Sequence, residues 1–376
     1  MEELRPLSDD ERLEWLRLIR SENIGPVTFR QLMDRFGDAG SAIAAIPELA
    51  RRGGARRTIR VRPQSAAKKE MAALVKLGGR MIAYCEPDYP RALAHIPDAP
   101  PVISVLGHPH LMDGIVIAMV GARNGSANGI RFTESLARGL AEAGLIVVSG
   151  MARGIDAAAH RGSIDSGTIA IMAGGVDIVY PKENQALYED IAARGLLISE
   201  HLLGMQPQAR HFPSRNRIVS GLAVATIVIE ATLRSGSLIT ARLAGEQGRE
   251  VLAVPGNPLD PRARGTNKLI REGAVLVECA DDVLEALAGM GTPNRLTEPS
   301  ASPFSFDHGT NDPGEAALAE ARERVISLLG PDPVPVDEML RKSSIPPAHV
   351  ALILLELELA GRLQRHAGGQ VSLAFD

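Results

Sequence analysis

Residues 115–150 read IVIAMVGARNGSANGIRFTESLARGLAEAGLIVVSG. Two runs within this stretch, Ile115–Val120 and Leu145–Ser149, are short, apolar and rich in β-branched residues, as parallel strands covered on both faces are. Between them, RFTESLARGLAEAG has the apolar spacing of a helix. The stretch therefore predicts a strand, a glycine-bearing loop, a helix and a second strand.

The same alternation continues along the chain. Further apolar runs are Thr168–Ala173, Leu196–Ser199, Val224–Ile229, Val251–Val254 and Val275–Val277. Helical stretches such as GSLITARLAGEQG stand between most of them. The pattern predicts an α/β fold, an extended Rossmann-like, doubly wound and mostly parallel sheet with right-handed crossovers.

Compositional breaks divide the 376 residues into several domains. Residues 289–314 are crowded with Gly, Pro, Ser, Thr and Asn, which indicates a linker. A weaker break near residues 54–65 separates a helical N-terminal part. We therefore expect a helical domain at 1–75, the Rossmann-like domain at 76–288 and a small C-terminal domain at 315–376.

The flanking domains have their own patterns. Residues 8–50 predict short helices, the first of which begins with a Ser/Asp cap. Their order resembles a helix-hairpin-helix domain that binds phosphate, and a small helical domain with a packing role is the alternative. Residues 315–376 predict three helices and a hairpin turning at Gly368-Gly369, which suggests a winged helix. Its third helix carries Glu356 and Glu358, so protein contact is favoured over base reading.

Composition excludes several classes of protein. Hydrophobic residues make up 45% and charged residues 23%, which excludes wholesale disorder. No apolar run is long enough to span a membrane, and the acidic N-terminus is unlike a secretory signal, so the cytosol is expected. Cys85 and Cys279 are far apart and belong to no CxxC pattern, which argues against structural disulfides and zinc.

The loops that follow the predicted strands share glycine and arginine. In open α/β sheets these loops meet at one edge, where ligands bind. Glycine lets backbone amides approach a ligand, and arginine offers a planar fork to phosphate oxygens. The candidate residues in these loops are Gly121, Arg123, Gly150, Arg153, Gly154, Phe212, Arg215, Asn216, Arg217, Ser235, Gly236 and Ser237. Together they predict a polyanion site, with Arg210, Arg215 and Arg217 as a local basic patch in a chain of net charge −4.

Motifs for catalysis are weak. GARNG does not match GxGxxG, and GxxxxGK[ST] does not occur, so neither NAD nor nucleoside triphosphate hydrolysis is supported, and no cofactor or metal is expected. Asp156 and His160 lie four residues apart and Glu230 closes a strand, but no nucleophile and base are linked by a motif. We expect His160 to pack or cap, and we name no catalytic residue.

Six blocks together resemble the DprA family (DNA processing protein A, also called Smf). They are SGMARGIDAAAH at 149–160, GGVDIVYP at 174–181, FPSRNRIVSGL at 212–222, EATLRSGSLITAR at 230–242, EQGREVLAVPG at 246–256 and GTNKLIREGA at 265–274. The flanking domains resemble that family's N-terminal sterile-alpha-motif-like domain and C-terminal winged helix. Two positions depart from the pattern: Ala122 stands where serine is common and Ala173 where glycine is common.

The resemblance implies a protein that binds single-stranded DNA, delivers it to the RecA recombinase during natural transformation, acts as a homodimer and catalyses no reaction. It implies a DNA pocket at Arg123, the Ser149–Gly154 loop, Phe212 with Arg215, Asn216 and Arg217, and the Ser235–Ser237 turn. If about four arginines neutralise phosphates, the logarithm of affinity falls with that of salt with a slope of about −3.

Two other classes of function remain. A nucleoside monophosphate phosphoribohydrolase has a similar architecture, but its GGxGTxxE loop is absent from this sequence. A scaffold whose terminal domains bind proteins would show no salt-dependent DNA binding.

Overall fold

A computed structural model of the chain describes residues 4–289, 315–366 and 368–374. These residues form two compact units: residues 4–7 and 69–289 make unit 1, and residues 8–68 and 315–374 make unit 2. The predicted linker lies, from residue 290 on, outside the described residues.

Unit 1 contains a nine-stranded sheet with the order β1-β2-β6-β5-β4-β3-β7-β8-β9. Its strands are β1 (Arg80–Ala83), β2 (Val102–Gly107), β3 (Val116–Val120), β4 (Ile146–Ser149), β5 (Thr168–Ile171), β6 (Leu196–Ser199), β7 (Ala225–Val228), β8 (Glu250–Ala253) and β9 (Val275–Leu276). The seven strands that are neighbours in the order β6-β5-β4-β3-β7-β8-β9 are all parallel. They correspond to the seven predicted apolar runs. The doubly wound, mostly parallel sheet is therefore confirmed.

Strands β1 and β2 were missed in the sequence. β1 pairs with β2, and β2 pairs with β6, both in antiparallel fashion. Both strands come before the stretch in which apolar runs and long helices alternate, so the pattern that predicted the other strands does not include them.

Helices cover both faces of the sheet. The α-helices of this part of the chain are α5 (Arg91–Ala94), α6 (Ala127–Glu142), α7 (Ile155–Ser163), α8 (Gln185–Arg194), α9 (His211–Leu222), α10 (Gly236–Glu246), α11 (Arg264–Arg271) and α12 (Ala280–Gly289), and α4 (Gln64–Lys76) connects the two units. Short 3₁₀ turns are η1 (Pro109–Asp113), η2 (Ile164–Ser166), η3 (Lys182–Asn184) and η4 (Pro261–Ala263).

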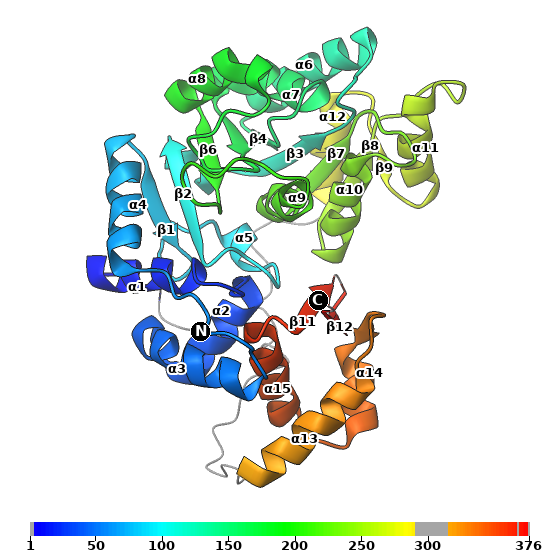
Figure 1. Ribbon diagram of the computed structural model, residues 1–376. Helices are drawn as coiled ribbons and strands as arrows, with labels where there is room; N and C mark the ends of the chain where they lie inside the picture. The colour runs from blue at the N-terminus through cyan, green and yellow to red at the C-terminus, as the bar shows by residue number, and fades with distance from the viewer. Residues whose placement is uncertain (1–3, 290–314, 367, 375–376) are drawn as a thin grey trace. The chain divides into compact units, whose positions relative to one another are not determined.

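Alternate residues of β3 face the two hydrophobic cores. Ile117 and Met119 pack with α6, α7 and α12 on one face, whereas Ala118 and Val120 pack with α5, α9 and α10 on the other. Figure 1 shows α6 and α7 on the opposite side of the sheet from α9 and α10. Burial on both faces explains why this strand is an unbroken apolar run.

Unit 2 combines the N-terminal helices with the C-terminal winged helix. Its elements are α1 (Asp9–Ile19), α2 (Pro26–Phe36), α3 (Ala39–Arg52), α13 (Glu315–Leu328), α14 (Val336–Ser343), α15 (Pro347–Leu359), β10 (Val334–Pro335), β11 (Leu363–His366) and β12 (Gln370–Leu373). The predicted Ser8 cap is confirmed, because its hydroxyl accepts from the Glu11 amide while the Glu11 carboxylate accepts from the Ser8 amide. The three helices and the hairpin expected at the C-terminus are also present.

Candidate nucleic-acid interface

The glycine loops after β3 and β4 lie against each other at the carboxyl end of the sheet. The Ile155 amide donates to the Ala122 carbonyl at 3.2 Å. Gly154 has a φ of +72°, and a Cβ there would lie 2.4 Å from the Ala122 carbonyl oxygen. A Cβ on Gly121 would meet the Ile155 side chain at 2.7 Å. Gly121 and Gly154 therefore allow the two loops to pack together, and their role at the interface is structural.

The switch point of the sheet lies between β3 and β7, the place where a Rossmann fold binds a dinucleotide. Here the carboxylate of Glu230 accepts from the Ser126 amide at 2.8 Å and from its hydroxyl at 2.6 Å. Ser126 is the N-cap of α6, so an acidic side chain occupies the helix end that would bind a pyrophosphate. Glu230, which follows β7, thus helps to cap helix α6.

Arg215 lies beneath the loop after β4 and is 5% exposed. Its Nη1 is 3.9 Å from Asp156 Oδ2, and its Nε has no hydrogen-bond partner among the described residues. A Cβ on Gly150 would come within 1.1 Å of Nη1, so glycine is needed where the guanidinium meets the backbone. Burial raises the pKa of Asp156 against the opposing effect of Arg215, and burial lowers the pKa of Arg215.

Arg217 is also buried and is held in internal ion pairs. Its Nε is 3.3 Å from Asp98 Oδ2 and its Nη2 bonds Glu200 Oε2. The expectation that Arg210, Arg215 and Arg217 form one open basic patch is wrong, because Arg215 and Arg217 are buried and paired with carboxylates, and Arg210 alone of the three is exposed. The sequence reading placed these residues in a loop, whereas they begin helix α9.

An open aromatic and cationic surface remains at the start of α9. The Arg123 guanidinium carbon lies 5.0 Å from the centroid of the Phe212 ring, and the Phe212 and Tyr180 ring centroids are 5.7 Å apart. Arg123 is exposed and Tyr180 is 47% exposed. The two rings, whose planes are tilted by 57°, lie beside a positive charge, and this arrangement suits a nucleic-acid base and its phosphate. Sequence reasoning missed Tyr180, although its place in the loop after β5 could have pointed to it.

The other candidate residues lie in varied settings. Arg153 forms an exposed ion pair with Glu183. The Ser149 hydroxyl is fully buried and donates to the Met119 carbonyl at 2.6 Å, so it links strand β4 to strand β3. Asn216 is partly exposed on α9.

The Ser235–Ser237 turn caps helix α10. The Ser235 hydroxyl accepts from the Ser237 amide at 3.3 Å and lies 2.6 Å from its hydroxyl. Gly236 is exposed, with no other group within 4 Å of the place a Cβ would take. The turn is thus an open helix N-terminus.

Family comparisons cover almost the whole described chain. Residues 80–288 match the family described as DNA recombination-mediator protein A. Residues 9–73 match the DprA-like N-terminal HHH domain, and residues 310–369 match the DprA winged helix domain. The chain belongs to the DprA family.

Individual DprA-family relatives agree with this. The chain is 34% identical to Protein Smf of Escherichia coli over 83% of this chain and 82% of the relative, and 37% identical to the putative DNA processing protein DprA of Mycobacterium tuberculosis over 90% and 85%. The solved DprA structure from Streptococcus pneumoniae superposes with a TM-score of 0.62 at 33% identity, covering 74% of this chain and 98% of that one. A Helicobacter pylori DprA structure, described for its single-stranded DNA binding mode, gives 0.52 at 28% identity, covering 56% and 96%.

His160 packs in this DprA-family fold, as expected. Its side chain is fully buried, and Nδ1 lies 2.9 Å from the Thr168 hydroxyl. Burial, with the nearby charges of Arg215 and Arg161, lowers its pKa to about 3, so the ring is neutral at pH 7.

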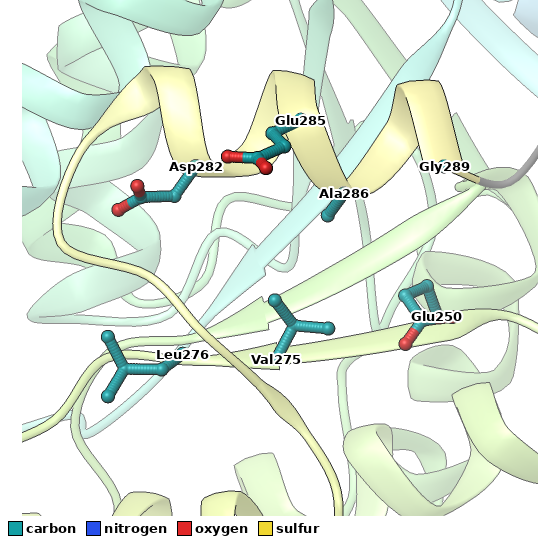
Figure 2. A pocket seen from close by; sticks show the side chains of 7 residues that line it. All are labelled: Glu250, Val275, Leu276, Asp282, Glu285, Ala286 and Gly289. Atoms are coloured by element: carbon teal, nitrogen blue, oxygen red, sulfur yellow. The ribbon is translucent and has the colours of Figure 1, made fainter.

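A pocket beside the edge strand β9 has the opposite charge character. It is lined by Glu250, Val275, Leu276, Asp282, Glu285, Ala286 and Gly289, and Figure 2 shows the side chains of α12 above the two strands. Three carboxylates make it unsuitable for a polyanion. Among the described residues there is no cluster of three metal-ligating side chains, and no helix is long and apolar enough to cross a bilayer.

Proposed function

We propose that this protein binds single-stranded DNA on the surface formed by Arg123, Phe212 and Tyr180, protects it, and loads RecA recombinase on it during natural transformation, without catalysing a reaction. The observation that carries the proposal is the arrangement of one exposed guanidinium and two neighbouring rings at the carboxyl end of the sheet. Membership in the recombination-mediator family and the single-stranded DNA binding of the H. pylori relative support it.

In this mechanism the rings hold bases and the cations hold phosphates. Stacking on aromatic side chains tolerates any base, so binding does not depend on sequence. Arg123 lies next to Phe212, where it can contact the phosphate of a base stacked on that ring. Arg215 adds positive potential from beneath Gly150, and the open N-terminus of α10 faces solvent.

The burial of Arg215 and Arg217 changes the expected salt dependence. The exposed arginines of the site are Arg123, Arg153 and Arg210, and Arg153 is already paired with Glu183. Two to three neutralised phosphates give a slope of about −2 for single strands, smaller than the −3 expected from the sequence. Fluorescence titration of an oligonucleotide at several salt concentrations measures it.

Variants of the exposed residues test the site directly. Arg123→Ala and Phe212→Ala should each weaken single-strand binding several-fold, and together by about a hundredfold, while the melting temperature stays within about 2 °C. Arg138→Ala, an exposed arginine on α6, is the matched control and should bind normally. Normal binding by the double variant would reject this surface as the DNA site.

The rival enzymatic function finds less support. Glu230 already fills the helix end that would bind a monophosphate at the switch point. Release of ribose 5-phosphate from nucleoside monophosphates, at a rate abolished by Glu230→Gln, would favour the hydrolase over the DNA-binding protein.

Partner proposals need their own measurements. We propose a homodimer, which would place two sites on one strand and raise avidity, and a cytoplasmic location, where RecA acts. Sedimentation measures the first. For RecA, the rate of filament formation on DNA coated with single-strand binding protein should rise with the wild type and remain basal with Arg123→Ala plus Phe212→Ala.

A further inference from the structure

The loop after β4 is tied to the η3 turn by a buried side chain. The Asn184 side-chain amide donates to the Met151 carbonyl at 3.0 Å and to the Ala152 carbonyl at 3.4 Å. Asn184 is 9% exposed, so water has little access to these bonds. They fix the η3 turn against the two residues that precede Arg153.

This connection places Glu183 opposite Arg153. Arg153 Nη2 donates to Glu183 Oε1 at 2.5 Å, and the two side chains are 61% and 60% exposed. Because Asn184 holds the backbone next to both residues, the ion pair is set by the fold and does not depend on two freely moving side chains meeting.

The ion pair lies beside the DNA surface of unit 1. Gly154, which follows the arginine of the pair, is so close to the loop after β3 that a Cβ there would lie 2.7 Å from the Arg123 carbonyl oxygen. Tyr180, one of the two rings of the DNA surface, is three residues before Glu183. Both members of the pair thus adjoin residues to which the proposed function gives a role in binding.

Glu183 places a negative charge among exposed cations. Lys182 next to it and Arg123 on the neighbouring loop are both exposed. A carboxylate and a phosphate compete for the same guanidinium, because the oxygens of both match its planar pair of donors. Exposed ion pairs add little stability and are screened by salt, so a phosphate can replace the carboxylate.

We propose that Glu183 is an internal competitor for DNA: a phosphate of the single strand replaces its carboxylate on Arg153. The displaced carboxylate then repels the bound strand. Glu183 in this way lowers the affinity and favours release, which suits a protein that passes its strand on to a recombinase. The inference rests on the proposed function, because it concerns the same DNA surface.

Competition differs from simple repulsion in its dependence on Arg153. A carboxylate beside the surface would repel DNA even if Arg153 never exchanged its partner. If a phosphate does replace the carboxylate, Glu183→Gln both frees Arg153 and removes the repulsion. In a protein that carries Arg153→Ala, the same change removes the repulsion alone, so its effect is smaller.

The test measures the binding of a fluorescent oligothymidylate by the full chain with Glu183→Gln, with Arg153→Ala and with both changes. At low salt, Glu183→Gln should tighten binding about three- to tenfold, and by less than about twofold when Arg153→Ala is also present. One more neutralised phosphate should make the salt slope of Glu183→Gln steeper by about 0.7. Arg153→Ala alone should weaken binding several-fold, because it leaves Glu183 unpaired beside the strand.

Two further variants serve as controls. Glu142→Gln changes the net charge equally, and Glu142 is an exposed residue at the end of α6. That helix leads from the carboxyl end of β3 to the start of the parallel strand β4, so Glu142 lies at the opposite edge of the sheet. Glu142→Gln should change affinity less than about twofold. Glu183→Ala should give the same gain as Glu183→Gln, which shows that the gain does not come from the new amide.

The outcomes separate this inference from the proposed function. Equal gains from Glu183→Gln with and without Arg153→Ala would overturn the proposal, because they would indicate repulsion without exchange. An unchanged affinity of Glu183→Gln would overturn it as well. Either result leaves the DNA surface in place if Arg123→Ala plus Phe212→Ala still weakens binding. Normal binding by that double variant would reject the DNA surface, and this inference with it.

Discussion

Individual arginines in this protein do different jobs although the sequence presents them alike. Arg123 is exposed beside an aromatic ring, whereas Arg217 is 7% exposed and bonded to two carboxylates. Sequence reasoning identified all of them as cations near a sheet edge. It could not assign their roles, because Asp98 and Glu200 come from parts of the chain that meet Arg217 only after folding.

Replacing Arg217 should therefore change stability. Arg217→Ala removes the buried guanidinium that pairs with Asp98 and with the largely buried Glu200, and should lower the free energy of unfolding by about 3 kcal/mol. Urea denaturation followed by circular dichroism measures the loss. Arg123→Ala, with its side chain in solvent, serves as the control and should unfold like the wild type. Equal stability of the two variants would contradict the structural role of Arg217.

His160 should make the protein sensitive to acid. Its pKa is about 3 in the folded state and 6.5 ordinarily, so the unfolded chain binds the proton more readily. Stability from this residue is complete above pH 6.5 and is lost as pH falls toward 3, by about 1.4 kcal/mol per pH unit. Unfolding measured between pH 7 and pH 4 should show this slope, and His160→Gln should reduce it. An identical pH profile in the variant would show that other groups cause the loss.

At the scale of elements, helix α9 shows how periodicity redirects side chains. Sequence reasoning grouped Arg215, Asn216 and Arg217 with the loops that follow the strands and expected both arginines to bind phosphate. In a helix, residues two apart point about 200° away from each other. Arg215 accordingly meets Asp156 while Arg217 meets Glu200.

The cap of helix α6 gives a prediction at this scale. Ser126 accepts from the Gly129 amide at 2.8 Å and donates to Glu230, so its hydroxyl joins the helix end to β7. Ser126→Ala should cost about 1 to 2 kcal/mol in thermal or urea unfolding. Ser126→Asp keeps a capping acceptor but places two carboxylates together, and should be no more stable than the alanine variant. A more stable aspartate variant would mean that Glu230 does not occupy this helix end.

At the scale of the whole molecule, the two ends of the chain fold into one unit. Asn23 donates to the Leu359 carbonyl at 3.0 Å, and Arg365 bonds both Glu358 and Gln31. Asn23 and Leu359 are more than 300 residues apart in the sequence, and so are Gln31 and Arg365. Sequence reasoning treated the helical domain and the winged helix separately, because contacts between chain ends leave no periodic pattern.

Gly53 is the position where this packing can be disturbed. Gly53→Val would force a side chain into the Glu356 backbone, so unit 2 should unfold at lower temperature while unit 1 is unchanged. Calorimetry should then resolve two transitions. Gly54→Val, which meets the flexible end of Arg362 but requires a positive φ, should have a smaller effect. A single transition shifted as a whole would show that the two units unfold together.

The parallel sheet, the helices of both flanking domains and the glycine-bearing loops follow from local patterns, because burial on two faces and helical spacing are written into neighbouring residues. The tertiary structure alone decides which guanidiniums stay in solvent. It also decides that α3 covers α15. Those outcomes depend on partners such as Asp98 and Gly53, which lie far from Arg217 and Glu356 in the chain and approach them only through long-range packing.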